Sequence, residues 1–128
     1  MRGYVLDASA LMALLNQEPG SERAAEIITE GALMSSVNLS EVVAKLSEKG
    51  MPGDVIHEVL DALGIMMVDF TSVLAYEVGL LRPLTKHTGL SLGDRACLAL
   101  AKHLNLPAVT ADRIWENLSL GITVQVIR

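Results

Sequence analysis

The sequence predicts an α/β fold in which a central, mostly parallel sheet of about five strands lies between two layers of helices. Short apolar runs of strand length alternate with segments of helical periodicity along all 128 residues, which is typical of βαβ units. The strand runs are almost continuously apolar, as expected when helices cover both faces of a sheet. No linker, repeat or low-complexity segment interrupts the alternation, so we expect one domain over residues 1–128.

Five apolar runs are predicted strands, and the segments between them are predicted helices. The strands occupy residues 3–6, 32–35, 65–68, 108–110 and 122–127. The helices occupy residues 8–16, 22–30, 36–49, 54–63, 71–87 and 92–104, followed by a short helix or turn over 111–118. Local signals set these bounds: Ser21 and Ser91 are predicted N-caps, and Pro83 predicts a kink or an end near Arg82.

The composition limits the setting and the kinds of partner. Hydrophobic residues make up 51% of the chain but aromatic residues only 3%, and no apolar run reaches the roughly 20 residues needed to span a bilayer. The chain begins directly with a strand pattern and has a single cysteine, Cys97, so we expect a cytoplasmic protein without a leader, disulfide or cysteine metal cluster. A net charge of −5 argues against a general nucleic-acid binder and suits acids that hold cations, or a basic partner protein.

Four acidic residues have positions that favour a shared site. Asp7 follows the first strand and Asp112 follows the fourth, while Asp94 and Glu41 lie in the first turns of the helices over 92–104 and 36–49. In a parallel sheet the carboxyl ends of the strands and the starts of the following helices share one edge. Asp7 and Asp112 belong there directly, and the other two do so if their helices start at that edge.

Each acid also has a purely structural interpretation. Asp7 could cap the helix after its strand, Asp94 could complete a capping box, and Asp112 could be a turn residue. Glu41 has the weakest case, because Lys45 stands four residues on and would pair with it on a solvated helix face. Taken one at a time, the residues leave these alternatives open.

Considered together, the four acids indicate a metal site. Several carboxylates at one edge would repel each other unless cations lie between them. Hard oxygen ligands without cysteine or paired histidine suit Mg²⁺ or Mn²⁺. Such an ion activates water and stabilises charge on a phosphate, so the chemistry suggested is phosphodiester hydrolysis by a metal-activated water.

Four short segments give the sequence a resemblance to a known family. They are VLDASA at residues 5–10, SEV at 40–42, LGDRACLALA at 92–101 and VTADRIW at 109–115. In this order and spacing the chain resembles PIN-domain nucleases, most closely the toxin ribonucleases of VapBC-type toxin–antitoxin pairs. The segments are distributed over the whole chain, and the acidic position of each is intact.

The resemblance implies a PIN-like three-layer fold and a Mg²⁺- or Mn²⁺-dependent endoribonuclease that cleaves single-stranded RNA. It implies that Asp7, Glu41, Asp94 and Asp112 form the catalytic metal site, and it is what raises Glu41 above the solvated interpretation. It also implies inhibition by a cognate antitoxin protein, and homodimerisation. The apolar faces of the opening helix and of the helical pair over 36–63 are candidates for binding an antitoxin helix.

Several other polar residues have candidate roles near this edge. Ser9 and Thr110 could hydrogen-bond the carboxylates and fix their rotamers, or could serve as caps and turn residues. Arg95 and Arg113 each follow a proposed ligand and could contact substrate phosphates, or could balance the local acid charge. Five further basic residues are interpreted as solvated surface, with a basic rim beside the acids as the alternative. They are Lys45, Lys49, Arg82, Lys86 and His87.

Rival functions fit less well. A phosphoaspartate enzyme of the haloacid-dehalogenase type needs a second aspartate two positions after Asp7, where this chain has Ser9. A receiver domain needs paired acids near the first strand, and a nucleotide-binding protein needs a glycine-rich turn after it; neither feature is evident. The remaining alternatives are a non-catalytic PIN-like module that binds RNA or a protein, and a housekeeping RNA-processing nuclease.

Overall fold

A five-stranded, fully parallel sheet forms the centre of the molecule. The computed structural model describes residues 2–128 and confirms the predicted α/β class. The strands are β1 (Tyr4–Leu6), β2 (Ala32–Ser35), β3 (Met66–Val68), β4 (Ala108–Thr110) and β5 (Val124–Val126), in the spatial order β3-β2-β1-β4-β5. All four strand pairs are parallel, as the continuous apolar runs predict.

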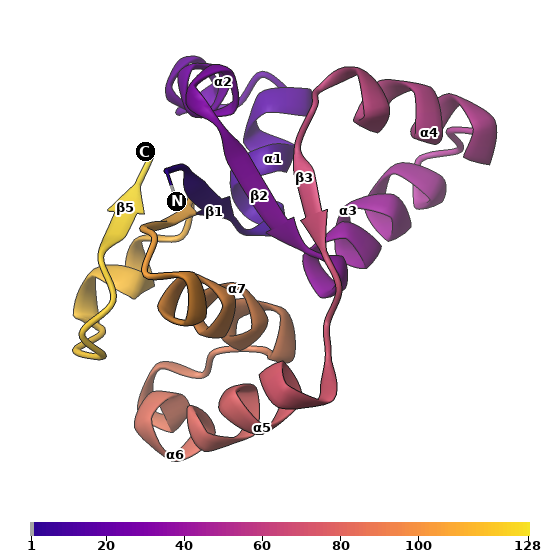
Figure 1. Ribbon diagram of the computed structural model, residues 1–128. Coiled ribbons are helices and arrows are strands. Elements are labelled where there is room, and N and C mark those ends of the chain that lie inside the picture. The colour runs from indigo at the N-terminus through magenta and orange to yellow at the C-terminus, as the bar shows by residue number, and fades with distance from the viewer. Residues whose placement is uncertain (1) are drawn as a thin grey trace.

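Helices connect the strands and cover both faces of the sheet (Figure 1). They are α1 (Ala8–Leu15), α2 (Ser21–Glu30), α3 (Ser36–Glu48), α4 (Gly53–Ala62), α5 (Ser72–Leu80), α6 (Arg82–Thr85) and α7 (Leu92–Leu104). The described residues also contain two 3-10 helices, η1 (Lys86–Thr88) and η2 (Arg113–Asn117). None of the helices within residues 2–128 has the length and apolar character to cross a bilayer.

The core consists of two hydrophobic clusters, one on each face of the sheet. Successive strand residues point to opposite faces, so Val5 belongs to the cluster under α5 and α7, while Leu6 belongs to the cluster under α1 to α4. Leu33 and Met34 of β2 divide in the same way. Both faces are therefore apolar and covered, which is why the strands have no alternating polar residues.

The strand order reverses at the centre of the sheet, and this reversal creates a site for ligands. The chain passes from β1 to β2 and β3 on one side and then returns to place β4 against the other side of β1. Ligands in such sheets bind outside the carboxyl ends of the strands at this switch point. Asp7 follows β1 and Asp112 lies two residues beyond β4, so both acids lie at the switch.

The structure differs from the sequence prediction at several boundaries. The predicted helix over 71–87 divides at Leu81 into α5 and α6, with Pro83 in the first turn of α6, as the break near Arg82 predicts. The prediction that Ser21 caps α2 is wrong. Gly20 is the N-cap, with φ +96°, and a Cβ there would meet the backbone oxygen of Ile127 at 2.7 Å. The last strand is shorter than the predicted 122–127.

Candidate functional site

Asp7 is the central residue of the candidate site. Its side chain is buried, with 3% exposed. It is the N-cap of α1, and its Oδ1 accepts a hydrogen bond of 2.8 Å from the Ala10 backbone N–H. The structural interpretation of Asp7 as a cap is therefore correct, although capping uses only part of its accepting capacity.

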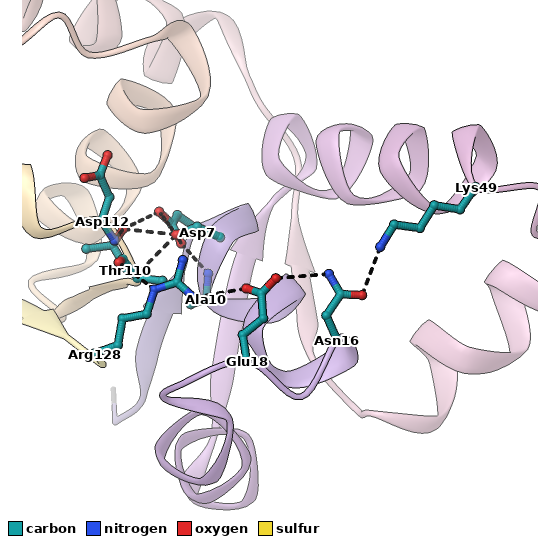
Figure 2. A network of polar contacts seen from close by, with 10 residues as sticks. Asp7, Ala10, Asn16, Glu18, Lys49, Thr110, Asp112 and Arg128 are labelled. Carbon is teal, nitrogen blue, oxygen red and sulfur yellow. Dashed lines mark hydrogen bonds and ion pairs between the residues drawn. The ribbon is translucent and has the colours of Figure 1, made fainter.

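Two hydroxyls complete the surroundings of Asp7. The Thr110 Oγ1 donates to Oδ2 at 2.6 Å (Figure 2), because the register of β1 with β4 places the two residues side by side. The Ser9 hydroxyl lies 2.8 and 2.9 Å from the two carboxylate oxygens and accepts from the backbone N–H of Ala111. These contacts fix the rotamer of Asp7 in the way predicted for Ser9 and Thr110; their role in catalysis stays a prediction.

Burial makes the ionisation of Asp7 costly. The pKa of the Asp7 carboxyl is raised from 3.8 to about 6, chiefly by burial and to a smaller extent by the nearby charge of Asp94. The hydrogen bonds from Thr110, Ala10 and Ser9 oppose this rise without cancelling it. A cation beside the carboxylate would lower the cost of ionisation, since an opposite charge favours the charged form.

Glu41 lies on α3 and packs against the start of α7. Its Oε1 accepts a hydrogen bond of 2.9 Å from the Asn38 amide, which also donates to the backbone oxygen of Gly93. A Cβ at position 93 would collide with the Glu41 carboxylate, so a glycine is needed there for this close approach. Glu41 is half-buried and does not pair with Lys45 within residues 2–128, so its solvated interpretation is wrong.

The sequence analysis did not identify Asn38, although the residue is 1% exposed. Its amide ties Glu41 on α3 to Gly93 on α7. The sequence does contain one signal for this residue. Asparagine is a poor helix former, and Asn38 stands four residues before the buried Val42, so both side chains lie on the covered side of α3. Such a residue is retained where its side chain has a partner.

Asp94 occupies the first turn of α7 and forms the predicted capping box. Its Oδ2 accepts from the Ser91 backbone N–H at 2.9 Å, and its own backbone N–H donates to the Ser91 hydroxyl. Its Oδ1 makes no hydrogen bond with residues 2–128 and remains able to accept from, or coordinate, a further group. Capping and ligand binding are therefore compatible at Asp94.

Asp112 lies at the same edge but is exposed. Its Oδ1 caps η2 by accepting from the Ile114 backbone N–H, and its own N–H donates to the Thr110 hydroxyl. Figure 2 shows its carboxylate turned away from Asp7. The structure thus ties the backbone of Asp112 to the site and leaves the carboxylate free to meet solvent or a ligand.

The four acids converge to different degrees. Glu41 lies against Gly93, and Asp94 is in the first turn of α7. The charges of Asp7, Asp94 and Glu41 all add to the effect of burial in raising the pKa of the Cys97 thiol, so the three carboxylates lie on the same side of the molecule, near the start of α7. None of the four acids forms an ion pair with a basic side chain in the described part of the chain. The site therefore concentrates negative charge that no protein cation balances.

The donor set fits a hard divalent cation. Carboxylate oxygens are the ligands that Mg²⁺ prefers, and Mg²⁺ takes few of them because it keeps several waters. Across residues 2–128, no three Asp, Glu, His or Cys side chains are placed to hold an ion by themselves. Water and substrate oxygens would therefore provide the remainder of the coordination.

The two arginines proposed for substrate phosphates have partners elsewhere. Arg95 is half-buried and donates through Nη1 to the backbone oxygen of Val78 on α5 at 3.2 Å. Arg113 is exposed and donates through Nε to the backbone oxygen of Arg128. Neither guanidinium forms an ion pair with the acids within residues 2–128, so their role toward phosphate stays a prediction.

Comparison with known proteins supplies a family. A family model described as PIN domain matches residues 4–119, which is most of the chain and contains all four acids. A comparison with curated proteins gives no match.

Several solved structures of similar fold are described as belonging to toxin–antitoxin systems. A toxin–antitoxin complex from Klebsiella pneumoniae matches with a TM-score of 0.76 and 17% identity over 98% of each chain. DNA-bound VapBC from Salmonella typhimurium matches with 0.75 and 19% over 100% of each chain. VapC20 from Mycobacterium tuberculosis, described as a sarcin–ricin loop cleaving toxin, matches with 0.71 and 14% over 87% of this chain and 91% of that chain. At these identities the matches establish a shared fold.

The raised pKa of Asp7 predicts how stability depends on pH without metal. Because the folded-state pKa exceeds the unfolded one, ionisation of Asp7 destabilises the fold as pH rises from about 4 to above 6, by about 3 kcal/mol in all. Asp7→Asn removes this ionisation. Its stability relative to wild type should therefore increase by up to about 3 kcal/mol between about pH 4 and pH 7, measured by urea unfolding in EDTA.

Asp69→Asn, at an exposed position, provides the matched control and should show little such increase. A constant difference between Asp7→Asn and wild type at both pH values would contradict the burial of an ionised Asp7.

Proposed function

We propose, since this chain belongs to the PIN-domain family, that it is a divalent-metal-dependent endoribonuclease and the toxin of a toxin–antitoxin pair. The substrate is single-stranded RNA, and the setting is the cytoplasm. The observation that carries the proposal is the gathering of Asp7, Glu41 and Asp94 at the switch point without a basic partner within residues 2–128. Its likeness in fold to VapBC complexes and to an RNA-cleaving toxin supports it further.

Asp7 and Asp94 are the proposed principal ligands for Mg²⁺ or Mn²⁺, with Glu41 and Asp112 completing the site directly or through water. When bound, the ion supplies charge stabilisation for a phosphate in displacement and lowers the pKa of water. Asp7 offers a carboxylate whose pKa is about 6, so it is mostly ionised at neutral pH. Asp94 offers the Oδ1 that its capping box does not use.

The chain's own contacts orient these carboxylates. Ser9, Thr110 and the Ala10 amide hold Asp7, and the Asn38 amide holds Glu41. Ligands fixed in this way need little reorganisation, which is how the residues behind a metal ligand improve binding and rate. Residues 1–128 are proposed to form one nuclease domain, and homodimerisation stays a prediction.

Cleavage assays test the proposal directly. Asp7→Asn and Asp94→Asn should each lower Mg²⁺- or Mn²⁺-dependent cleavage of single-stranded RNA by at least about 100-fold, because each removes a charged ligand. EDTA should abolish cleavage, and either ion should restore it. Thr110→Val, which removes only the hydroxyl behind Asp7, should cost about 10- to 100-fold.

Equal cleavage by wild type and both aspartate variants would indicate a contaminating nuclease. In that case the non-catalytic module, which binds RNA or a protein without cutting, becomes the better hypothesis. A housekeeping nuclease would cleave but would not arrest growth when expressed, and a toxin should arrest it.

The contact between Gly93 and Glu41 gives a second prediction. Gly93→Ala would place a methyl group where the Glu41 carboxylate lies and should lower cleavage by about 10- to 100-fold through its displacement. Stability should change by no more than about 1 kcal/mol, because alanine favours the helix. Gly53→Ala at the start of α4, where a Cβ meets open space, is the control and should leave cleavage unchanged. Equal activity of both variants would mean that the position of Glu41 does not matter.

An apolar groove between α3 and α4 is the proposed site for the antitoxin. It has a volume of about 240 Å³, and Leu39, Val43, Ile56, Leu60 and Met67 contribute to its lining. An amphipathic helix can bury its apolar face in such a groove. The likeness of the fold to chains in toxin–antitoxin complexes supports a cognate antitoxin as the occupant.

A charge in the groove should separate the two proposed activities. Val43→Glu should prevent co-purification with a co-expressed cognate antitoxin, while RNA cleavage stays within about twofold, because a buried unpaired charge is costly only in the complex. Leu84→Glu, at an exposed apolar position of α6, is the control and should keep the partner. Loss of the partner with Leu84→Glu alone would place the antitoxin on the opposite side of the molecule.

A further inference from the structure

A polar groove leads away from the candidate site. It has a volume of about 520 Å³ and lies along α1 and the end of α3, with Ser9 at one place in its lining and Lys45, Lys49 and Arg128 at others. Ser9 also hydrogen-bonds to Asp7, so one residue of the groove lining directly contacts the candidate site. Its volume is within the roughly 300–1,000 Å³ of sites that hold drug-sized ligands, which is sufficient for a nucleotide-sized segment.

The groove has more positive than negative groups, in contrast to the chain as a whole. Lys45, Lys49 and Arg128 line it together with two carboxylates, those of Glu18 and Glu48. This leaves one positive charge in excess, in a chain whose net charge is −5. Basic side chains therefore lie close to the edge of the sheet where the carboxylates would repel phosphate.

Hydrogen bonds within the groove determine which cations remain available. Arg128 donates through Nη1 to Glu18 at 3.0 Å and through Nε to the backbone oxygen of Ala111, and its bond to Glu18 lowers the pKa of that carboxyl. Lys49 donates to the neutral amide oxygen of Asn16 at 3.0 Å (Figure 2). Glu18 thus neutralises Arg128, whereas Lys49 is oriented without a direct ion pair.

Lys45 has no side-chain partner in the part of the chain that the structure describes. Its ammonium makes neither a hydrogen bond nor an ion pair with any of residues 2–128. It lies one helical turn before Lys49 on α3, so the two ammonium groups project along the same side of the helix. Each ammonium group still has N–H donors that make no bond within residues 2–128. The two lysines can therefore bind neighbouring phosphates of one RNA strand.

We propose that this groove binds the phosphate backbone of the RNA on one side of the scissile bond, with Lys45 and Lys49 as positioning residues. The inference rests on the proposed ribonuclease function. RNA is favoured over an acidic peptide because Ser9 lines the groove and also contacts Asp7, so a chain that is cleaved at the acids passes beside the groove. Arg95, which donates to Val78, does not supply this contact in the structure.

The test compares two double variants of the full chain. Lys45→Ala/Lys49→Ala removes the proposed contacts, and Lys86→Ala/Lys102→Ala removes the same charge from exposed positions on η1 and α7. Each phosphate contact to a single strand contributes about 0.7 to the slope of log affinity against log salt. The groove variant should therefore lose about 1.4 of that slope and bind a fluorescent oligouridylate roughly 10- to 30-fold more weakly in about 0.1 M salt.

In cleavage assays the groove variant should raise KM by a similar factor and change kcat little, while the control variant keeps both. Equal effects of the two double variants on binding, with wild-type cleavage intact, would overturn this inference alone. Absence of both RNA binding and cleavage in wild type would overturn the proposed function together with it. Binding of polyglutamate but not of oligouridylate by the groove would identify an acidic peptide as the occupant and also overturn it.

Discussion

The burial of one carboxylate between β1 and β4 is the constraint on which the rest of the site depends. Asp7 ends a strand inside the sheet, where water cannot solvate it, and the fold surrounds it with the hydroxyls of Ser9 and Thr110 and the amide of Ala10. These bonds orient the group but do not neutralise it, and its pKa stays raised. A cation bound beside Asp7 would therefore stabilise the ionised form of this carboxylate.

Most of the architecture follows from local patterns in the sequence. The apolar runs predict all five strands, and the breakers predict the division at Leu81, because strand length and proline geometry are local properties. Asp7 and Asp112 could be placed at one edge since both follow strands of a parallel sheet. The capping box of Asp94 could be predicted from its spacing alone.

What the sequence did not reveal depends on contacts between distant segments. Nothing near Asn38 indicates that its amide reaches Gly93, 55 residues away, or that Glu41 packs there instead of pairing with Lys45. The same holds for Arg95, whose partner is a backbone oxygen of α5, and for Gly20, which approaches Ile127. The resemblance to a family singled out Glu41, and only the packing of α3 against α7 explains how it is held.

The hydrogen bond from Thr110 to Asp7 joins residues 103 positions apart, and this separation has a consequence during synthesis. A nascent chain from which β4 has not yet emerged lacks one of the two strands that flank β1, together with the Thr110 hydroxyl and Asp112. Such a chain lacks the completed pocket, because the contacts between β1 and β4 join segments that are far apart in the sequence. For the ribonuclease proposed here, assembly of the candidate site is thereby postponed until translation of the chain is almost finished.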